Sequence, residues 1–241
     1  MPADEARSER AGSRKRGGPF DWVFVVAVAA VVATIVRAVY FTPVEARQGA
    51  AQKIFYLHAP SAFVALYVAF GLMALASALY LWLRDPRLDQ LASSSAEVGL
   101  AFTTVVLVTG PIWGKTVWGA WWTWDARLTL TLFLWLIILG YLVLRGAVED
   151  RQLRARYSAV LALLAALLIP FIHLSVYLFR TLHPQPIVLK PSAPSLPPEM
   201  LTTFLMALAS ILLLYVALLR ARYALARAYA SADAADDEAY A

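Results

Sequence analysis

The feature that most constrains the fold is a series of long apolar segments, each near the roughly 20 residues that a helix needs to span a bilayer. Five such segments are plain, at 22–41, 61–83, 128–144, 157–179 and 200–219. Hydrophobic residues make up 61% of the 241-residue chain and charged residues only 15%, so the chain is far more apolar than a soluble domain. The pattern predicts an all-α integral membrane protein.

A sixth segment, at 93–112, is less apolar because it contains Glu97, two glycines and a proline. We count it as a span, since an odd number of spans would break the alternation of charge between the loops. The sequence therefore predicts six transmembrane helices in a membrane domain at 22–219. A basic segment at 1–21 precedes this domain and a tail at 220–241 follows it.

Positive charge is distributed unevenly between the two sides of the predicted bundle. One side carries fourteen of the 21 Lys and Arg residues: Arg7, Arg10, Arg14, Lys15, Arg16, Arg84, Arg87, Arg145, Arg151, Arg154, Arg156, Arg220, Arg222 and Arg227. The other side carries six: Arg47, Lys53, Lys115, Arg127, Arg180 and Lys190. The positive-inside rule predicts that both termini are cytoplasmic. Anionic lipid headgroups account for the net charge of +5, so no nucleic-acid partner is indicated.

The connection between the third and fourth spans is unusually rich in tryptophan. Five of the eight tryptophans fall within 113–124, and a membrane-interface belt accounts for only one or two at each helix end. In a short surface helix, Trp118, Trp121 and Trp122 would share one face and Trp124 would turn away. We expect an aromatic platform suited to a planar amphipathic ligand. A purely anchoring role is the alternative.

Asp125 and Arg127 follow the tryptophans directly. Asp125 precedes the apolar run of the fourth span, where an Asp commonly caps the helix, and this role is favoured over that of a catalytic carboxylate. Arg127 is expected either to extend toward the membrane surface or to meet an anionic group of a ligand. We assign no catalytic residue.

Cysteine is absent, which excludes thiol redox chemistry and thiolate metal sites, and there are three histidines. His58 and His183 are expected on loops at the outer surface. Pro60 suits a first helical turn, so His58 should lie just before a helix, where the dipole favours neutral imidazole. Two histidines are too few for zinc but match the two axial positions of a haem iron. His173, in the fifth span, is expected to satisfy the carbonyl freed by Pro170, with ligation as the alternative.

Three motifs carry a resemblance to a known family. They are "WGAWWTWDARLT" at 118–129, "FYLHAPSA" at 55–62 and "TLH" at 181–183. With them, residues 20–220 resemble the haem-handling family of cytochrome c maturation that carries the WWD motif, and its six-helix CcmC group in particular. The chain departs from the usual pattern at Phe179 and Arg180, where the family commonly has an aromatic residue and Asn.

The resemblance implies a function and its location. An outer loop at 113–127, with Trp118, Trp121, Trp122, Trp124, Asp125 and Arg127, would cradle non-covalent haem b at the periplasmic face of a bacterial inner membrane. A Pro-rich outer loop at 180–199 would carry His183, which with His58 would ligate the iron. The implied partners are the haem chaperone CcmE, the ATP-binding cassette unit CcmA with CcmB, and a small CcmD-like subunit. Such a chain is a binding and transfer protein rather than an ordinary enzyme.

Two other functions compete with haem handling. A b-type membrane cytochrome also holds haem between two histidines, but within helices that face each other across a bundle. A subunit that transports haem or another solute would need broken helices and polar groups in mid-membrane, and these spans offer little beyond Glu97 and His173. We therefore expect the chain to receive and present a ligand at the outer face.

Overall fold

The computed structural model describes residues 21–188 and 190–239, so most of the predicted basic segment lies outside it. Within these ranges the protein is all-α, with one isolated β-bridge between Glu45 and Gly49. Six helices, some of them composite, are long and apolar enough to cross a membrane, as predicted. The weakest predicted span is among them, inside a helix that is 33 residues long.

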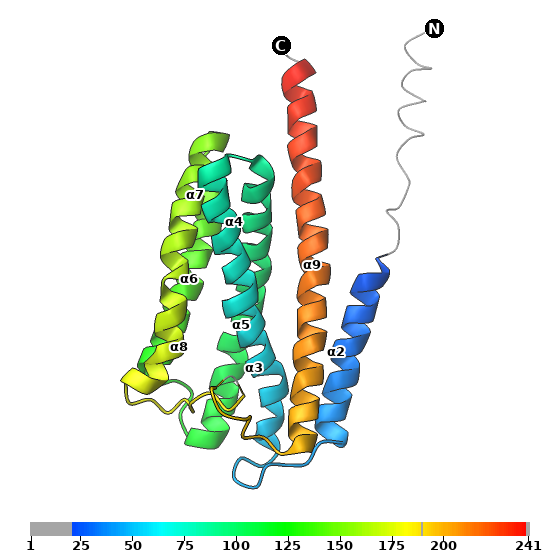
Figure 1. Cartoon of the computed structure of the whole chain (residues 1–241), viewed down its shortest axis with the longest axis vertical. Helices are drawn as coiled ribbons and strands as arrows, with labels where there is room; N and C mark the ends of the chain where they lie inside the picture. Colours follow the sequence, from blue (N-terminus) through cyan, green and yellow to red (C-terminus); the bar gives the residue numbers. More distant parts are fainter. Residues whose placement is uncertain (1–20, 189, 240–241) are drawn as a thin grey trace.

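The six spans follow one another as an antiparallel bundle (Figure 1). They are α2 (Trp22–Tyr40); a continuous span made of the 3₁₀ turn Ala50–Ile54, α3 (Phe55–Phe63), the π-helical turn Val64–Ala69 and α4 (Phe70–Leu83); α5 (Pro86–Trp118); α6 (Ala126–Ala147); α7 (Arg151–Ala166) with α8 (Leu168–Leu178); and α9 (Pro198–Ala239).

Aspartate side chains begin four of these helices. Asp21, Asp85, Asp125 and Asp150 stand at the N-caps of α2, α5, α6 and α7, where each carboxylate accepts a backbone N–H of the first turn. Such caps satisfy donors that a helix cannot pair internally. The predicted cap at Asp125 is therefore confirmed.

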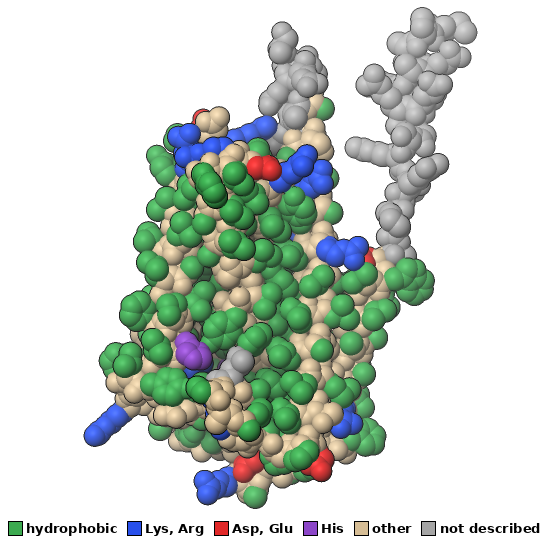
Figure 2. All heavy atoms as spheres, viewed as in Figure 1, with side chains coloured by type: hydrophobic (Ala, Val, Ile, Leu, Met, Phe, Trp, Pro, Cys, Tyr) green, Lys and Arg blue, Asp and Glu red, His purple; other side chains and the backbone are tan. Residues whose placement is uncertain are grey.

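The core forms where α4 packs against α5 and α7, and where α6 packs against α7 and α8. Phe70, Met73, Leu134, Ile138 and Tyr141 are fully buried there. α9 contacts α2, α3 and α5 and joins α2 to the rest of the bundle. Apolar side chains dominate the middle of the face in Figure 2, and basic side chains gather at its ends. This distribution suits a multi-pass membrane protein.

The second span begins earlier than its apolar stretch indicates. It starts at Ala50 rather than near residue 61, and Pro60 lies inside α3 instead of in a first turn. An internal proline removes one helical hydrogen bond. Here the turns before it are still formed, because Phe55 and Tyr56 are buried in the core. The expectation that His58 precedes a helix on a loop was therefore wrong.

Candidate functional site

Two adjoining cavities, of about 90 and 580 Å³, lie at the end of the bundle that carries the tryptophans. Both are lined by His58, His183 and Arg127. α3 supplies His58, the loop after α8 supplies His183, and the first turn of α6 supplies Arg127. The fold thus brings three of the predicted site residues together from distant parts of the sequence.

His58 is oriented by α5. Its Nδ1 lies 2.9 Å from the hydroxyl oxygen of Thr109, and this hydroxyl donates to the Val105 carbonyl at 2.7 Å. With its proton committed to that carbonyl, the Thr109 oxygen accepts from Nδ1–H of the imidazole. The neutral ring then carries no proton on Nε2, the state in which that nitrogen can bind a metal. The ring also packs edge-to-face on Trp113, with centroids 5.7 Å apart.

His183 is held in the same tautomer by a different partner. Its Nδ1 lies 2.9 Å from the carbonyl oxygen of Pro184, which can only accept, so Nδ1–H donates. Nε2 again remains without a proton. Burial and the nearby guanidinium of Arg127 lower the pKa of the His183 imidazole to about 3. The ring is therefore neutral at neutral pH, as ligation of a metal requires.

Asp125 connects the tryptophan segment to the loop of His183. One carboxylate oxygen accepts the Leu128 N–H at 3.0 Å as the α6 cap. The other accepts the hydroxyl of Thr181 at 2.7 Å, and the oxygen of Thr181 accepts the backbone N–H of His183 at 3.1 Å. A single carboxylate thus starts α6 and positions the loop that carries a candidate ligand. The role of Thr181 depends on tertiary contact, and only its place in "TLH" points to it in the sequence.

Two buried donors beside the cavities have no partner. Nη1 of Arg127 and Nε1 of Trp122 form no hydrogen bond within the described part of the chain. Buried polar groups are nearly always paired in folded proteins, and leaving one unpaired is costly. Arg127 lines both cavities, and Trp122 lines the smaller one. These donors fit an occupant that carries carboxylate oxygens.

The tryptophans are arranged differently from the surface helix considered above. α5 runs on to Trp118 and ends at Gly119, whose φ of 78° favours glycine, and residues 119–125 are not helical. Trp118 and Trp122 line the smaller cavity, whereas Trp121 and Trp124 are 60% and 76% exposed. The expectation that residues 118, 121 and 122 share a helical face was wrong, because the glycine turn redirects the chain.

Other residues around the cavities were not among the predicted site residues, although Trp113 belongs to the predicted tryptophan cluster. Besides Thr109, they include Trp113, whose Nε1 donates to the Gln48 side chain at 2.9 Å, and Gln52, which lines the larger cavity. His173 lines that cavity as well, and its Nδ1 lies 2.6 Å from the hydroxyl of Tyr67. The prediction that His173 pairs with a backbone carbonyl freed by Pro170 was therefore wrong. In the sequence, Thr109 is a polar residue within a predicted span and Trp113 begins the tryptophan cluster, whereas Gln52 precedes the predicted second span and carries no such signal.

The chain matches proteins of known family over most of its length. Residues 13–235 match the family model described as heme exporter protein C. The protein of that name from Haemophilus influenzae is 37% identical over 189 residues, which cover 78% of this chain and 76% of the relative. That from Bradyrhizobium diazoefficiens is 40% identical over 176 residues (73% and 66%), and that from Escherichia coli K12 is 35% identical over 162 residues (67% and 66%).

The alignments with the last two relatives thus cover just under two thirds of the relatives' lengths. Among residues 21–188 and 190–239, no three His, Cys, Asp or Glu side chains are grouped to hold a metal ion by themselves. The match to the family model spans all six helices, both candidate histidines and the tryptophan segment. The chain therefore belongs to the heme exporter protein C (CcmC) family.

Proposed function

We propose that this chain handles haem for cytochrome c maturation, holding haem b non-covalently between His58 and His183. The observation that carries the proposal is that both histidines line one pair of adjoining cavities. Each has its Nδ1 hydrogen-bonded, to Thr109 in one case and to Pro184 in the other, which leaves Nε2 available. The porphyrin supplies four ligands to the iron, so two imidazoles complete its coordination.

The size and lining of the cavities support the same cargo. The larger cavity measures about 580 Å³, within the range of roughly 300–1,000 Å³ typical of small-molecule sites. Trp113, Trp118 and Trp122 provide flat apolar surface, and the unpaired donors of Arg127 and Trp122 suit the propionate groups. Asp125 takes a positioning role through Thr181 rather than contact with the cargo.

Presentation to the chaperone CcmE would use the exposed part of the tryptophan segment. Trp121 and Trp124 expose most of their side chains beside the cavities, and exposed aromatic surface of this kind marks interaction sites. By the charge distribution, this end of the bundle faces away from the cytoplasm and both termini are cytoplasmic. By the resemblance to the haem-handling family, the side it faces is the periplasm, across a bacterial inner membrane. CcmA, CcmB and a CcmD-like subunit complete the proposed set of partners.

A membrane cytochrome is the second candidate, and one observation favours it. His58 lies inside α3, as an axial ligand of a b-type cytochrome would. His183 does not, because it follows α8 on a loop. Reversible reduction and reoxidation of the bound haem by quinol would favour the electron carrier, whereas transfer of haem to CcmE would favour haem handling.

Three single variants test the ligands: His58→Ala, His183→Ala and His173→Ala. We expect either of the first two to change the absorbance spectrum of bound haem, because the iron loses an axial nitrogen. His173→Ala should leave it nearly unchanged, because His173 lines the larger cavity alone, whereas His58 and His183 line both. Free imidazole should partly restore the spectra of the first two variants by filling the empty position, which it cannot do for a folding defect.

The opposite pattern would contradict the ligand assignment. If His173→Ala lost haem while His183→Ala kept the wild-type spectrum, the second ligand would be His173. The haem would then lie deeper in the bundle, and the b-type cytochrome would become the better proposal.

A further inference from the structure

A third cavity, of about 840 Å³, lies at the end of the bundle opposite the histidines. It is lined by the end of α4 and by parts of α5, α6, α7 and α9. Its charged lining residues are Arg84, Arg145, Arg151, Arg154, Arg156 and Arg222, with Asp89 and Glu97. Arginines thus exceed carboxylates by four in this lining, and the haem site proposed above uses none of these residues.

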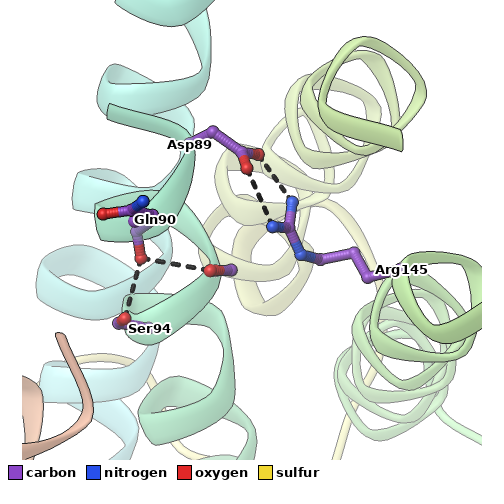
Figure 3. A network of polar contacts seen from close by, with 5 residues as sticks. Asp89, Gln90, Ser94 and Arg145 are labelled. Atoms are coloured by element: carbon purple, nitrogen blue, oxygen red, sulfur yellow. Dashed lines mark hydrogen bonds and ion pairs between the residues drawn. The ribbon is translucent and has the colours of Figure 1, made fainter. Parts of the chain in front are cut away.

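Both carboxylates are already paired within the protein. Asp89 accepts two hydrogen bonds from Arg145, at 2.6 and 2.8 Å, in the parallel geometry that guanidinium and carboxylate groups favour (Figure 3). In the same view the Gln90 carbonyl accepts the Ser94 hydroxyl. Glu97 accepts from Nε and Nη2 of Arg222. The acidic residues of the lining therefore do not neutralise the other arginines.

Several guanidinium groups have capacity for a further acceptor. Nη1 of Arg222 is buried and forms no hydrogen bond within the described residues. Over residues 21–188 and 190–239, Arg154 and Arg156 form no ion pair with a described carboxylate. A buried N–H group without an acceptor is costly, and guanidinium binds phosphate through two parallel hydrogen bonds. The chemistry of the lining fits a phosphate-bearing anion.

The depth of the cavity indicates which kind of phosphate fits. Its lining extends along α5 from Pro86 to Glu97, a rise of about 16 Å at roughly 1.5 Å per residue. Headgroup layers account for only about 5–8 Å on each side of a bilayer, so the cavity reaches hydrocarbon depth. There its lining includes the apolar side chain of Leu142. Of α4–α7, α9 packs mainly against α5.

We propose that this cavity is a binding site for an anionic phospholipid, with the headgroup phosphate among Arg154, Arg156 and Arg222. The acyl chains extend along the apolar part of the lining between α6 and α9. An excess of four positive charges selects a headgroup with net negative charge over a zwitterionic one.

The test measures lipid bound to the purified full-length protein. The protein in detergent is titrated with phosphatidylglycerol or phosphatidylcholine, and bound lipid is quantified by native mass spectrometry. The variant Arg154→Gln with Arg156→Gln removes two charges from the cavity. The matched control, Arg87→Gln with Arg227→Gln, removes two charges at the same end of the bundle from exposed residues outside the lining.

We expect wild type and control to bind phosphatidylglycerol alike and more tightly than phosphatidylcholine. The cavity variant should bind phosphatidylglycerol about thirty-fold more weakly, since one arginine near an anionic headgroup contributes about fivefold. Arg222→Lys keeps the charge but removes the buried Nη1 donor and the two-point contact with Glu97, and it should weaken binding. Unfolding temperatures identify any variant that fails to fold.

Three outcomes would overturn the proposal. Equal losses in the cavity and control variants would mean that only general surface charge attracts lipid. Equal affinities for the two lipids would show that the arginines do not select an anionic headgroup. Tight binding of inorganic phosphate in the absence of lipid, lost in the cavity variant, would identify a site for a free anion. None of these readouts depends on haem, so the proposed function is tested separately.

Discussion

At the scale of single residues, the two candidate ligands show the same physical arrangement on different elements. His58 on α3 and His183 on a loop each donate Nδ1–H to an oxygen held by the protein, Thr109 Oγ1 and the Pro184 carbonyl. Such a hydrogen bond fixes the tautomer and the orientation of the ring. Removing the hydrogen-bond partner of a metal-binding histidine commonly lowers metal affinity 10- to 100-fold. Thr109 is therefore a positioning residue, not a ligand.

Replacing Thr109 tests that role. Thr109→Val keeps the side-chain shape but removes the acceptor for His58 Nδ1–H. We expect haem affinity to fall about tenfold or more, and Thr109→Ser to restore most of it. Titration of haem into the purified protein, followed by absorbance, measures the change. Thr116→Val is the control, since Thr116 is an exposed residue of α5 whose hydroxyl donates to the Ile112 carbonyl of the same helix. Equal haem affinities of Thr109→Val and Thr116→Val would refute the positioning role.

At the scale of elements, helix starts serve both stability and the site. Asp125 and Asp150 cap α6 and α7 in the same way, each accepting the N–H three residues later. Only Asp125 has a second role, because it also accepts the Thr181 hydroxyl and so joins the start of α6 to the loop of His183. Comparing the two caps therefore distinguishes an effect on helix stability from an effect on the position of the loop that carries His183.

Removing each cap should distinguish the two effects. Asp125→Ala and Asp150→Ala should each cost about 1 kcal/mol of stability, the typical value of an N-cap. Only Asp125→Ala should also lower haem retention, because the His183 loop loses its anchor. Unfolding temperature and haem content per protein are the measurements. If Asp150→Ala lost as much haem as Asp125→Ala, the loss would reflect stability alone and the proposed anchor would be wrong.

At the scale of the whole molecule, the two ends of the bundle differ in chemistry. One end combines tryptophans, two histidines and unpaired donors around two cavities. The other combines six arginines around a third cavity. Between them, the side chains exposed around α2, α6 and α8 are largely apolar, as a hydrocarbon environment requires. The proposed orientation places the histidine end outside and the arginine end in the cytoplasm.

Cysteine labelling tests this orientation, because the native chain has no cysteine. Single cysteines at Ala120 and Ser192 should react with a membrane-impermeant thiol reagent added to intact spheroplasts, and one at Ser231 should react only after lysis. Ala120 and Ser192 flank the histidine end, and Ser231 lies on the extension of α9 at the other end. Reaction at Ser231 but not at Ala120 would invert the proposed topology.

The sequence by itself determined the features that depend on local pattern. Apolar length predicted six spans, Asp125 before an apolar run predicted a cap, and the motifs indicated the family. Only the tertiary structure decided which side chains meet. It placed His58 inside a helix beside Thr109, linked Asp125 to the His183 loop through Thr181, and gathered Arg84, which follows α4, and arginines of α6, α7 and α9 around one cavity. The physical reason is the distance along the sequence over which each effect acts. Capping acts within a few residues and hydropathy within a single span, whereas cavities form from helix packing between segments distant in the sequence.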